Sequence, residues 1–83
     1  MTKAGTPNGK VSLLFTYDVD CDNHVVYSVG VDESGKYYSV EDHEYNIGSA
    51  YDFYTDYYVL DDSEIEGLRR KAKARENSEK RIP

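Results

Sequence analysis

The chain has 83 residues, a formal net charge of −6 and a single cysteine, which excludes an intramolecular disulfide. This length suits one small domain with a modest core. Apolar runs are short, as at residues 13–15, and no apolar segment follows the first four residues, so we expect neither a secretory signal nor a membrane span. A reduced, cytoplasmic setting is expected, or the host cytoplasm if a phage encodes the chain.

The charges are segregated along the chain. Residues 1–17 carry two Lys and no acid, residues 18–66 carry fourteen Asp and Glu with one Lys, and residues 67–83 carry seven Lys and Arg with two Glu. The sequence therefore predicts an acidic domain body that is followed by a basic segment.

The first half of the chain predicts a flexible lead-in and a β-hairpin. Residues 1–9 contain Gly, Pro and Asn and no apolar periodicity, which is typical of a flexible segment. Residues 11–20 and 24–32 alternate apolar and polar side chains, which indicates two strands. Because the connection is short, we expect these strands to pair antiparallel.

The hairpin register follows from keeping one face apolar. A three-residue loop at 21–23 does so, and its third residue, Asn23, accepts a left-handed backbone better than most residues. This register pairs Val19 with Val25, Tyr17 with Tyr27, Phe15 with Val29, and Leu13 with Val31.

The middle of the chain predicts further strands. Residues 36–41 form a third strand in which Tyr38 and Val40 face the core, and residues 42–50 form a loop. Within residues 47–60, the segment 51–60 fits a strand by its Tyr, Thr and Val content. A helix with Ser49 as its cap is the alternative for this segment.

The clearest element is a C-terminal helix that Asp62 or Ser63 caps and that ends near residue 77. Glu66 completes a capping box with Ser63. An apolar stripe consists of Ile65, Leu68 and Ala72. The sequence thus predicts an α+β domain over residues 10–77, in which a three- to four-stranded antiparallel meander packs against one C-terminal helix. A disordered basic tail at 78–83 follows it.

The sequence predicts neither a calcium site nor a zinc site. Residues 18–29 place acids at the first, third and fifth positions of a calcium loop, but Asn23 replaces the required Gly and Val29 replaces the bidentate Glu. For zinc, Cys21 and His24 form only one close pair. A set completed by His43 with Asp42 or Glu44 lacks the second close pair of a structural site.

Catalysis and cofactor binding are not expected either. Asp20 and Asp22 flank Cys21 and should raise the pKa of its thiol, which disfavours the nucleophilic thiolate. The sequence contains no Gly-rich phosphate loop, no Gly-x-Ser-x-Gly elbow and no His-Glu-x-x-His motif. We therefore expect a non-catalytic protein.

The remaining functional signal is an acidic sheet face opposite the core. Carboxylates that a sheet holds in place can occupy a basic groove that normally binds nucleic acid, and tyrosines among them add contact area. The predicted partner-binding residues are Asp18, Asp20, Asp32, Glu41, Asp52, Asp56, Tyr37, Tyr54 and Tyr58. In composition alone, the chain resembles phage-encoded inhibitors of host nucleic-acid enzymes, including anti-restriction and anti-CRISPR proteins.

The basic helix end supports two alternative functions. It would contact nucleic acid phosphates directly, although the acidic body repels the same polyanion. It would otherwise contact the acidic sheet of a second copy and so form a homodimer. The residues of this alternative site are Arg69, Arg70, Lys71, Lys73 and Arg75.

Overall fold

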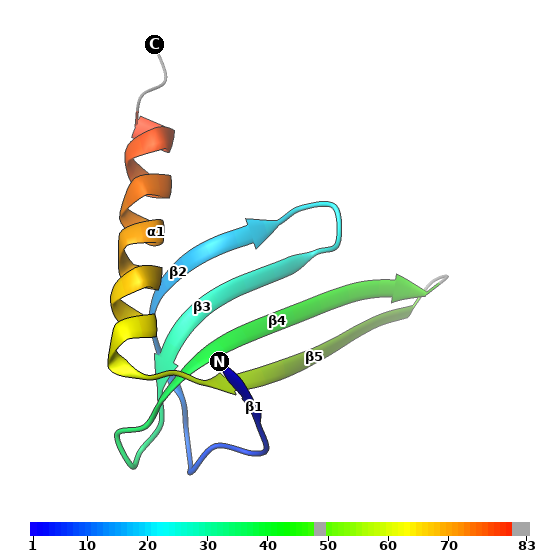
Figure 1. Ribbon diagram of the computed structural model, residues 1–83. Helices are drawn as coiled ribbons and strands as arrows, with labels where there is room; N and C mark the ends of the chain where they lie inside the picture. The colour runs from blue at the N-terminus through cyan, green and yellow to red at the C-terminus, as the bar shows by residue number, and fades with distance from the viewer. Residues whose placement is uncertain (48–49, 81–83) are drawn as a thin grey trace.

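An antiparallel sheet and a C-terminal helix form the molecule in the computed structural model (Figure 1). The structure describes the backbone of residues 1–47 and 50–80, and the side chains of residues 1–44 and 53–77. The elements are β1 (Thr2–Ala4), β2 (Ser12–Asp20), β3 (Val25–Val31), β4 (Tyr37–Ile47), β5 (Ala50–Val59) and α1 (Asp62–Lys80).

The sheet order is β1-β5-β4-β3-β2, so β2 to β5 form a meander and β1 adds to its far edge. The predicted α+β class, antiparallel meander and single C-terminal helix are confirmed. The sheet has five strands rather than three or four, because Thr2–Ala4 pairs with β5 through Thr2↔Val59 and Ala4↔Tyr57. The predicted lead-in at 1–9 thus includes a strand.

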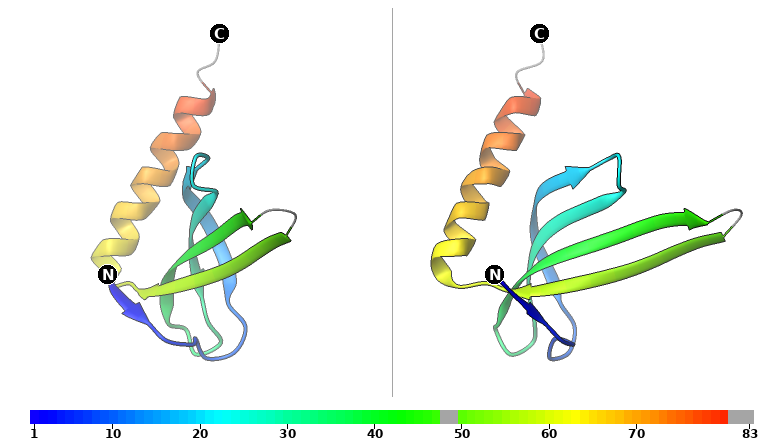
Figure 2. Two further views of the ribbon diagram at one scale, coloured as in Figure 1. Left: turned by 90° about the vertical axis from the view of Figure 1, so that its right-hand side faces the viewer. Right: turned by 45° about the vertical axis from the view of Figure 1, so that its right-hand side comes forward.

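The main core lies between α1 and one face of the sheet. Its buried members are Tyr17, Val29, Leu60 and Ile65, with Phe15, Tyr27, Leu68 and Ala72 partly buried against them. The predicted apolar stripe of the helix is therefore confirmed. Since α1 contacts β2 above all, it covers only part of this sheet face, as Figure 2 shows.

The β2–β3 register differs from the predicted one on both sides of Phe15. Phe15 pairs with Val29 as predicted, but register shifts between Leu13 and Phe15 and between Thr16 and Asp18 pair Leu13 with Gly30 and Val19 with Val26. Such bulges insert an extra residue into one strand and move each later pair by one position. The loop is therefore four residues long, and His24 rather than Asn23 adopts the left-handed backbone, with φ of 55°.

Strand β4 is longer than predicted and shifted by one residue. Val29 pairs with Ser39, so Tyr38 and Val40 are buried on the sheet face opposite α1 rather than in the main core. A shift of one residue exchanges the two faces of a strand. Most of the predicted loop at 42–50 belongs to β4, and the strand interpretation of residues 51–60 is confirmed by β5.

The helix begins one residue earlier than either predicted cap allows. Asp61 Oδ1 accepts a hydrogen bond from the backbone N–H of Glu64 at 2.8 Å, and Glu64 Oε1 accepts one from the backbone N–H of Asp61 at 3.1 Å. This capping box replaces the predicted pair of Ser63 and Glu66. The helix extends to Lys80, into the predicted tail, and residues 81–83 lie outside the described part.

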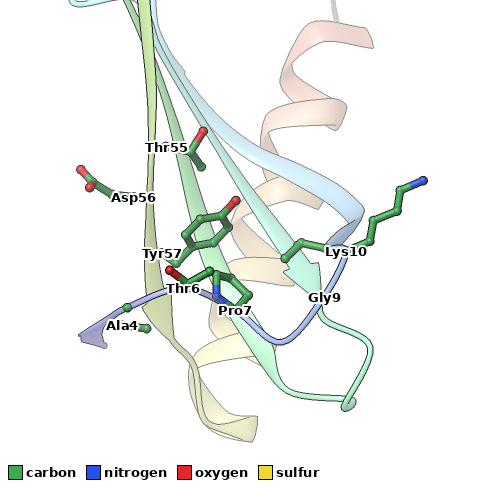
Figure 3. Close-up of a pocket in the computed structure, with 10 residues that line it drawn as sticks. Ala4, Thr6, Pro7, Gly9, Lys10, Thr55, Asp56 and Tyr57 are labelled. Carbon is green, nitrogen blue, oxygen red and sulfur yellow. The ribbon is translucent and has the colours of Figure 1, made fainter.

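The sheet face opposite α1 is covered at one end by the N-terminal segment 5–11, which connects the two edge strands. A Cβ on Gly30 would lie 2.7 Å from Val11 Cγ1, so this segment requires a glycine beneath it. A hollow lies between the segment and β5 (Figure 3). We call this end of the molecule, residues 5–11 and 32–36, the closed end.

Candidate functional site

The opposite end of the sheet consists of the two hairpin tips, residues 18–27, 41–47 and 50–56, which we call the open end. The β4–β5 hairpin extends beyond the β2–β3 hairpin, because Val25 at the start of β3 pairs with His43 rather than with the end of β4. Figure 1 shows this longer hairpin projecting away from α1. The helix therefore leaves this part of the sheet uncovered.

The open end is acidic and contains no Lys or Arg in its sequence. Paired residues of adjacent strands share a face, about 4.8 Å apart, and alternate residues of one strand lie about 6.7 Å apart. Its carboxylates therefore occupy fixed positions on a stiff support. Those with described side chains are Asp18, Asp20, Asp22, Glu41, Asp42, Glu44 and Asp56.

Three side chains converge on one point of the open end. Glu41 and His43 alternate along β4, and Asp56 of β5 pairs with Glu41, so all three share the sheet face of Tyr27. One ligand atom from each of the three lies within 4.8 Å of the other two. Figure 3 shows Asp56 pointing to the opposite side of β5 from Thr55 and Tyr57. We call these three residues the β4–β5 cluster.

The imidazole of His43 sits between the two carboxylates. Its Nε2 atom lies 3.4 Å from Glu41 Oε1 and 3.5 Å from Asp56 Oδ2. The ring stacks on Tyr54 with a centroid separation of 4.3 Å and an interplanar angle of 5°. The side chains of the cluster are 19–26% exposed, so the cluster is recessed but reachable from solvent.

Two predicted site residues, Asp18 and Asp20, bind within this chain. Asp18 Oδ2 accepts a hydrogen bond from Lys71 Nζ at 3.2 Å, which lowers the pKa of Asp18. Asp20 accepts hydrogen bonds from the Asn23 side chain at 2.8 Å and from the backbone N–H groups of Asp22 and Asn23, which lower its pKa. Asp20 therefore stabilises the hairpin turn.

Asp32 does not belong to an exposed acidic face, contrary to the prediction. It is 5% exposed at the closed end. Its carboxylate accepts hydrogen bonds from three backbone N–H groups and from two hydroxyl groups, which hold its pKa well below the usual range. The donors are the N–H groups of Asn8, Ser34 and Lys36 and the hydroxyls of Ser34 and Tyr38. The physical reason is the Asp-x-Ser turn, which draws the carboxylate inward.

The other predicted residues divide between the two ends. Tyr54 lies at the open end, stacked on His43. Tyr37 pairs with Val31 and Tyr58 pairs with Ser39, so both lie away from the hairpin tips. The side chain of Asp52 lies outside the described residues. The predicted acidic residues Asp18, Asp20, Glu41 and Asp56 lie on the helix-side face, not on the face opposite the core. The bulge between Thr16 and Asp18 places the first two there, and the one-residue shift of β4 places the other two.

Sequence reasoning did not find the β4–β5 cluster. It placed His43 beside Asp42 and Glu44, which strand alternation puts on the other face. The signal was available in principle, because only residues 48 and 49 separate the paired residues Ile47 and Ala50. A hairpin of that register brings Glu41 opposite Asp56.

Phe53, another residue that sequence reasoning did not single out, is 67% exposed at the open end, and Tyr54 beside it is 47% exposed. Aromatic side chains at this level of exposure are typical of interaction surfaces. They lie on opposite faces of β5, next to Glu44 and His43 respectively.

The basic helix residues are partly engaged by the rest of the chain. The Arg69 guanidinium lies 5.2 Å from the Phe15 ring centroid, and Lys71 binds Asp18. Arg70 pairs with Glu66 at 3.7 Å. Lys73 is exposed and Arg75 is half-buried. Arg69 and Lys71 thus contact β2, whereas Arg70 pairs within the helix.

The open end provides two kinds of chemistry, a fixed array of anions with exposed aromatic rings and a histidine held between two carboxylates. Both suit recognition of cationic groups. In the described part of the chain, no helix has the length and the apolar character that crossing a membrane requires. Comparisons with models of protein families, with curated proteins and with solved structures gave no match to this chain.

Proposed function

We propose that the protein is a non-catalytic binding protein that inserts the open end of its sheet into a basic, nucleic-acid-binding site of a partner protein. The observation that carries the proposal is the charge of this end, where carboxylates cluster and Lys and Arg are missing from the sequence. A surface of this kind produces a negative potential that complements a groove lined by Lys and Arg.

The rigidity of the sheet supports this proposal. Carboxylates fixed on paired strands lose little conformational entropy when they bind, unlike carboxylates on a flexible tail. Asp20 is held by the turn, and Glu41 and Asp56 are placed opposite each other by the pairing of β4 with β5. The pattern of charges therefore exists before a partner arrives.

The exposed aromatic residues of β5 add contact area to the charges. Phe53 and Tyr54 are large and restricted to two side-chain torsions, so they bury surface at a small entropic cost. Their position beside Glu44 and His43 is that of a central anchor in a polar rim. A basic groove that binds nucleic acid commonly contains apolar or aromatic patches for bases, which would receive such rings.

The basic helix is less suited to a primary binding role. Two of its cations lie on β2 residues and a third pairs with Glu66, so contact with phosphates would compete with these interactions. Direct binding of duplex DNA is therefore expected to be absent in a gel-shift assay. Homodimer formation between the helix and the open end of a second copy would appear as a salt-dependent mass in solution.

The test is capture of partners from a nuclease-treated cell lysate at low salt, followed by elution with rising salt. We expect basic nucleic-acid-binding proteins that added duplex DNA displaces, because DNA competes for the same site. Charge reversal in Glu44→Lys should weaken binding of the captured partner about tenfold. Salt-independent capture, or a partner that DNA leaves bound, would contradict the proposal.

A matched control is Glu66→Lys, which changes the net charge equally but lies on the helix, where Glu66 is exposed. It should leave partner binding nearly unchanged. An equal loss in both variants would mean that net charge rather than the open end determines binding.

A further inference from the structure

The Nε2 atom of His43 is a buried polar atom that has no hydrogen-bond partner among the described residues. Its separations from Glu41 Oε1 and Asp56 Oδ2, 3.4 and 3.5 Å, exceed the usual range of about 2.7–3.2 Å for N–H···O hydrogen bonds. A buried polar atom without a partner is costly, so an additional group that contacts this nitrogen would stabilise the site.

The same separations fit a metal ion. Zinc binds imidazole nitrogen and carboxylate oxygen at about 2.0–2.2 Å, which places neighbouring ligands of a tetrahedral site about 3.3–3.6 Å apart. Both measured separations around Nε2 fall in this range. The third pair, the ligand oxygens of Glu41 and Asp56, lies within 4.8 Å. A side-chain adjustment alone would bring these two oxygens to the separation of a tetrahedral site.

We propose that Glu41, His43 and Asp56 form a binding site for a divalent transition-metal ion, with Zn²⁺ as the preferred occupant. Two carboxylates balance the charge of a divalent cation, and an imidazole nitrogen favours zinc over calcium or magnesium, which prefer oxygen ligands alone. Three protein ligands leave coordination positions for water, and the partial exposure of the cluster gives these positions access to solvent.

The surroundings of the cluster support the ligand roles. Stacking on Tyr54 fixes the plane of the His43 ring, as neighbouring groups commonly do for metal-binding histidines. Lys3 Nζ lies 3.7 Å from Asp56 Oδ1, whereas the atom facing His43 is Oδ2. Lys3 therefore pairs with one oxygen of the Asp56 carboxylate and leaves the second oxygen to the ion. Because the three ligands come from β4 and β5, a bound ion would also link the two strands.

The proposal is tested by titrating ZnCl₂ into the metal-free 83-residue chain in a buffer without chelating groups, with the heat of binding as the readout. We expect one Zn²⁺ per chain with micromolar affinity, a higher melting temperature at saturating Zn²⁺, and little heat from MgCl₂. His43→Gln, Glu41→Gln and Asp56→Asn should each weaken Zn²⁺ binding by about 100-fold or more. Circular dichroism would show that the variants are folded.

The second histidine provides a matched control. His24 has a left-handed backbone, so His24→Asn is the substitution that this backbone tolerates best. It should leave Zn²⁺ affinity within about twofold of that of the unmodified chain. Co²⁺ offers an independent readout, since its visible spectrum distinguishes tetrahedral from octahedral coordination.

No Zn²⁺ binding, or an affinity that His43→Gln leaves unchanged, would overturn the proposal. In either case Glu41, His43 and Asp56 would not be the ligands of a metal ion. An equal loss in His24→Asn would also overturn it, because it would show diffuse binding by surface groups. The titration needs no partner protein, so its failure is independent of that of the proposed function.

Discussion

Asp20 and Asp32 illustrate how the two ends of one sheet use the same residue differently. Each carboxylate follows or ends a strand and accepts hydrogen bonds from a turn. At the open end Asp20 binds only residues of its own turn, whereas at the closed end Asp32 also binds Asn8 and Tyr38. The difference shows that a carboxylate holds the fold together when it connects segments distant in sequence, and otherwise organises its turn alone.

The largest expected effect comes from Asp32→Ala. This change leaves backbone N–H groups and the Tyr38 hydroxyl without their acceptor at a site that is 5% exposed. It also releases the N-terminal segment, which Asp32 holds through Asn8. We expect the variant to be largely unfolded at 37 °C by circular dichroism. A melting temperature within a few degrees of that of the unmodified chain would contradict this assignment.

Acid should act on the same residue. The pKa of Asp32 is lowered in the folded state from about 4 in the unfolded chain, so the folded state binds fewer protons. Its contribution to stability is complete above about pH 5 and is lost as the pH falls through 4 toward the folded pKa. Asp18, Asp20 and Asp61 act in the same direction.

We therefore expect the melting temperature to fall steeply between about pH 5 and pH 2. In Asp32→Asn the starting stability should be lower and the dependence on pH weaker, because one of the titrating groups is removed. Equal slopes for the two proteins would show that the other carboxylates dominate acid unfolding.

The sequence was sufficient for the elements whose pattern is local. Alternation identified β2, β3 and the first half of β4, and Ile65, Leu68 and Ala72 identified the buried side of the helix. The turn role of Asp32 was also readable, since Asp-x-Ser-Gly is a turn sequence in which Asp accepts local N–H groups. It was overlooked because its alternation with Val31 also fits an outward position.

The remaining features depend on interactions between segments. Bulges at β2 shift the register by one residue, and no local property of Leu14 or Tyr17 marks them. The position of β4 places Ser39 rather than Val40 opposite Val29, although alternation alone favours the valine. The β4–β5 cluster was missed because residues 42–50 were expected to form a loop, which removed His43 from the strand that carries Glu41 opposite Asp56.

A smaller loss of stability is expected from alanine substitutions on the two faces of β3. Val29 is 0% exposed beneath the helix, and Val29→Ala should lower the free energy of unfolding by about 2 kcal/mol, from lost burial and the cavity left behind. Val26→Ala is the matched substitution on the other face, where the side chain is 38% exposed. It should cost less than about 0.5 kcal/mol. Urea denaturation measures the free energy of unfolding of both variants. Equal losses would contradict the position of the core beneath the helix.

The smallest expected effect is that of Asp20→Ala, which is the counterpart of Asp32→Ala at the open end. The change removes three hydrogen bonds, but each donor lies in an exposed turn where water replaces the lost acceptor. The melting temperature should therefore fall by no more than about 5 °C. Amide exchange should increase at Asp22 and Asn23 and remain unchanged in the core, since local opening of a tip does not require global unfolding. A loss as large as that of Asp32→Ala would mean that the open end is part of the cooperative core, which would also remove the structural basis for assigning binding to it.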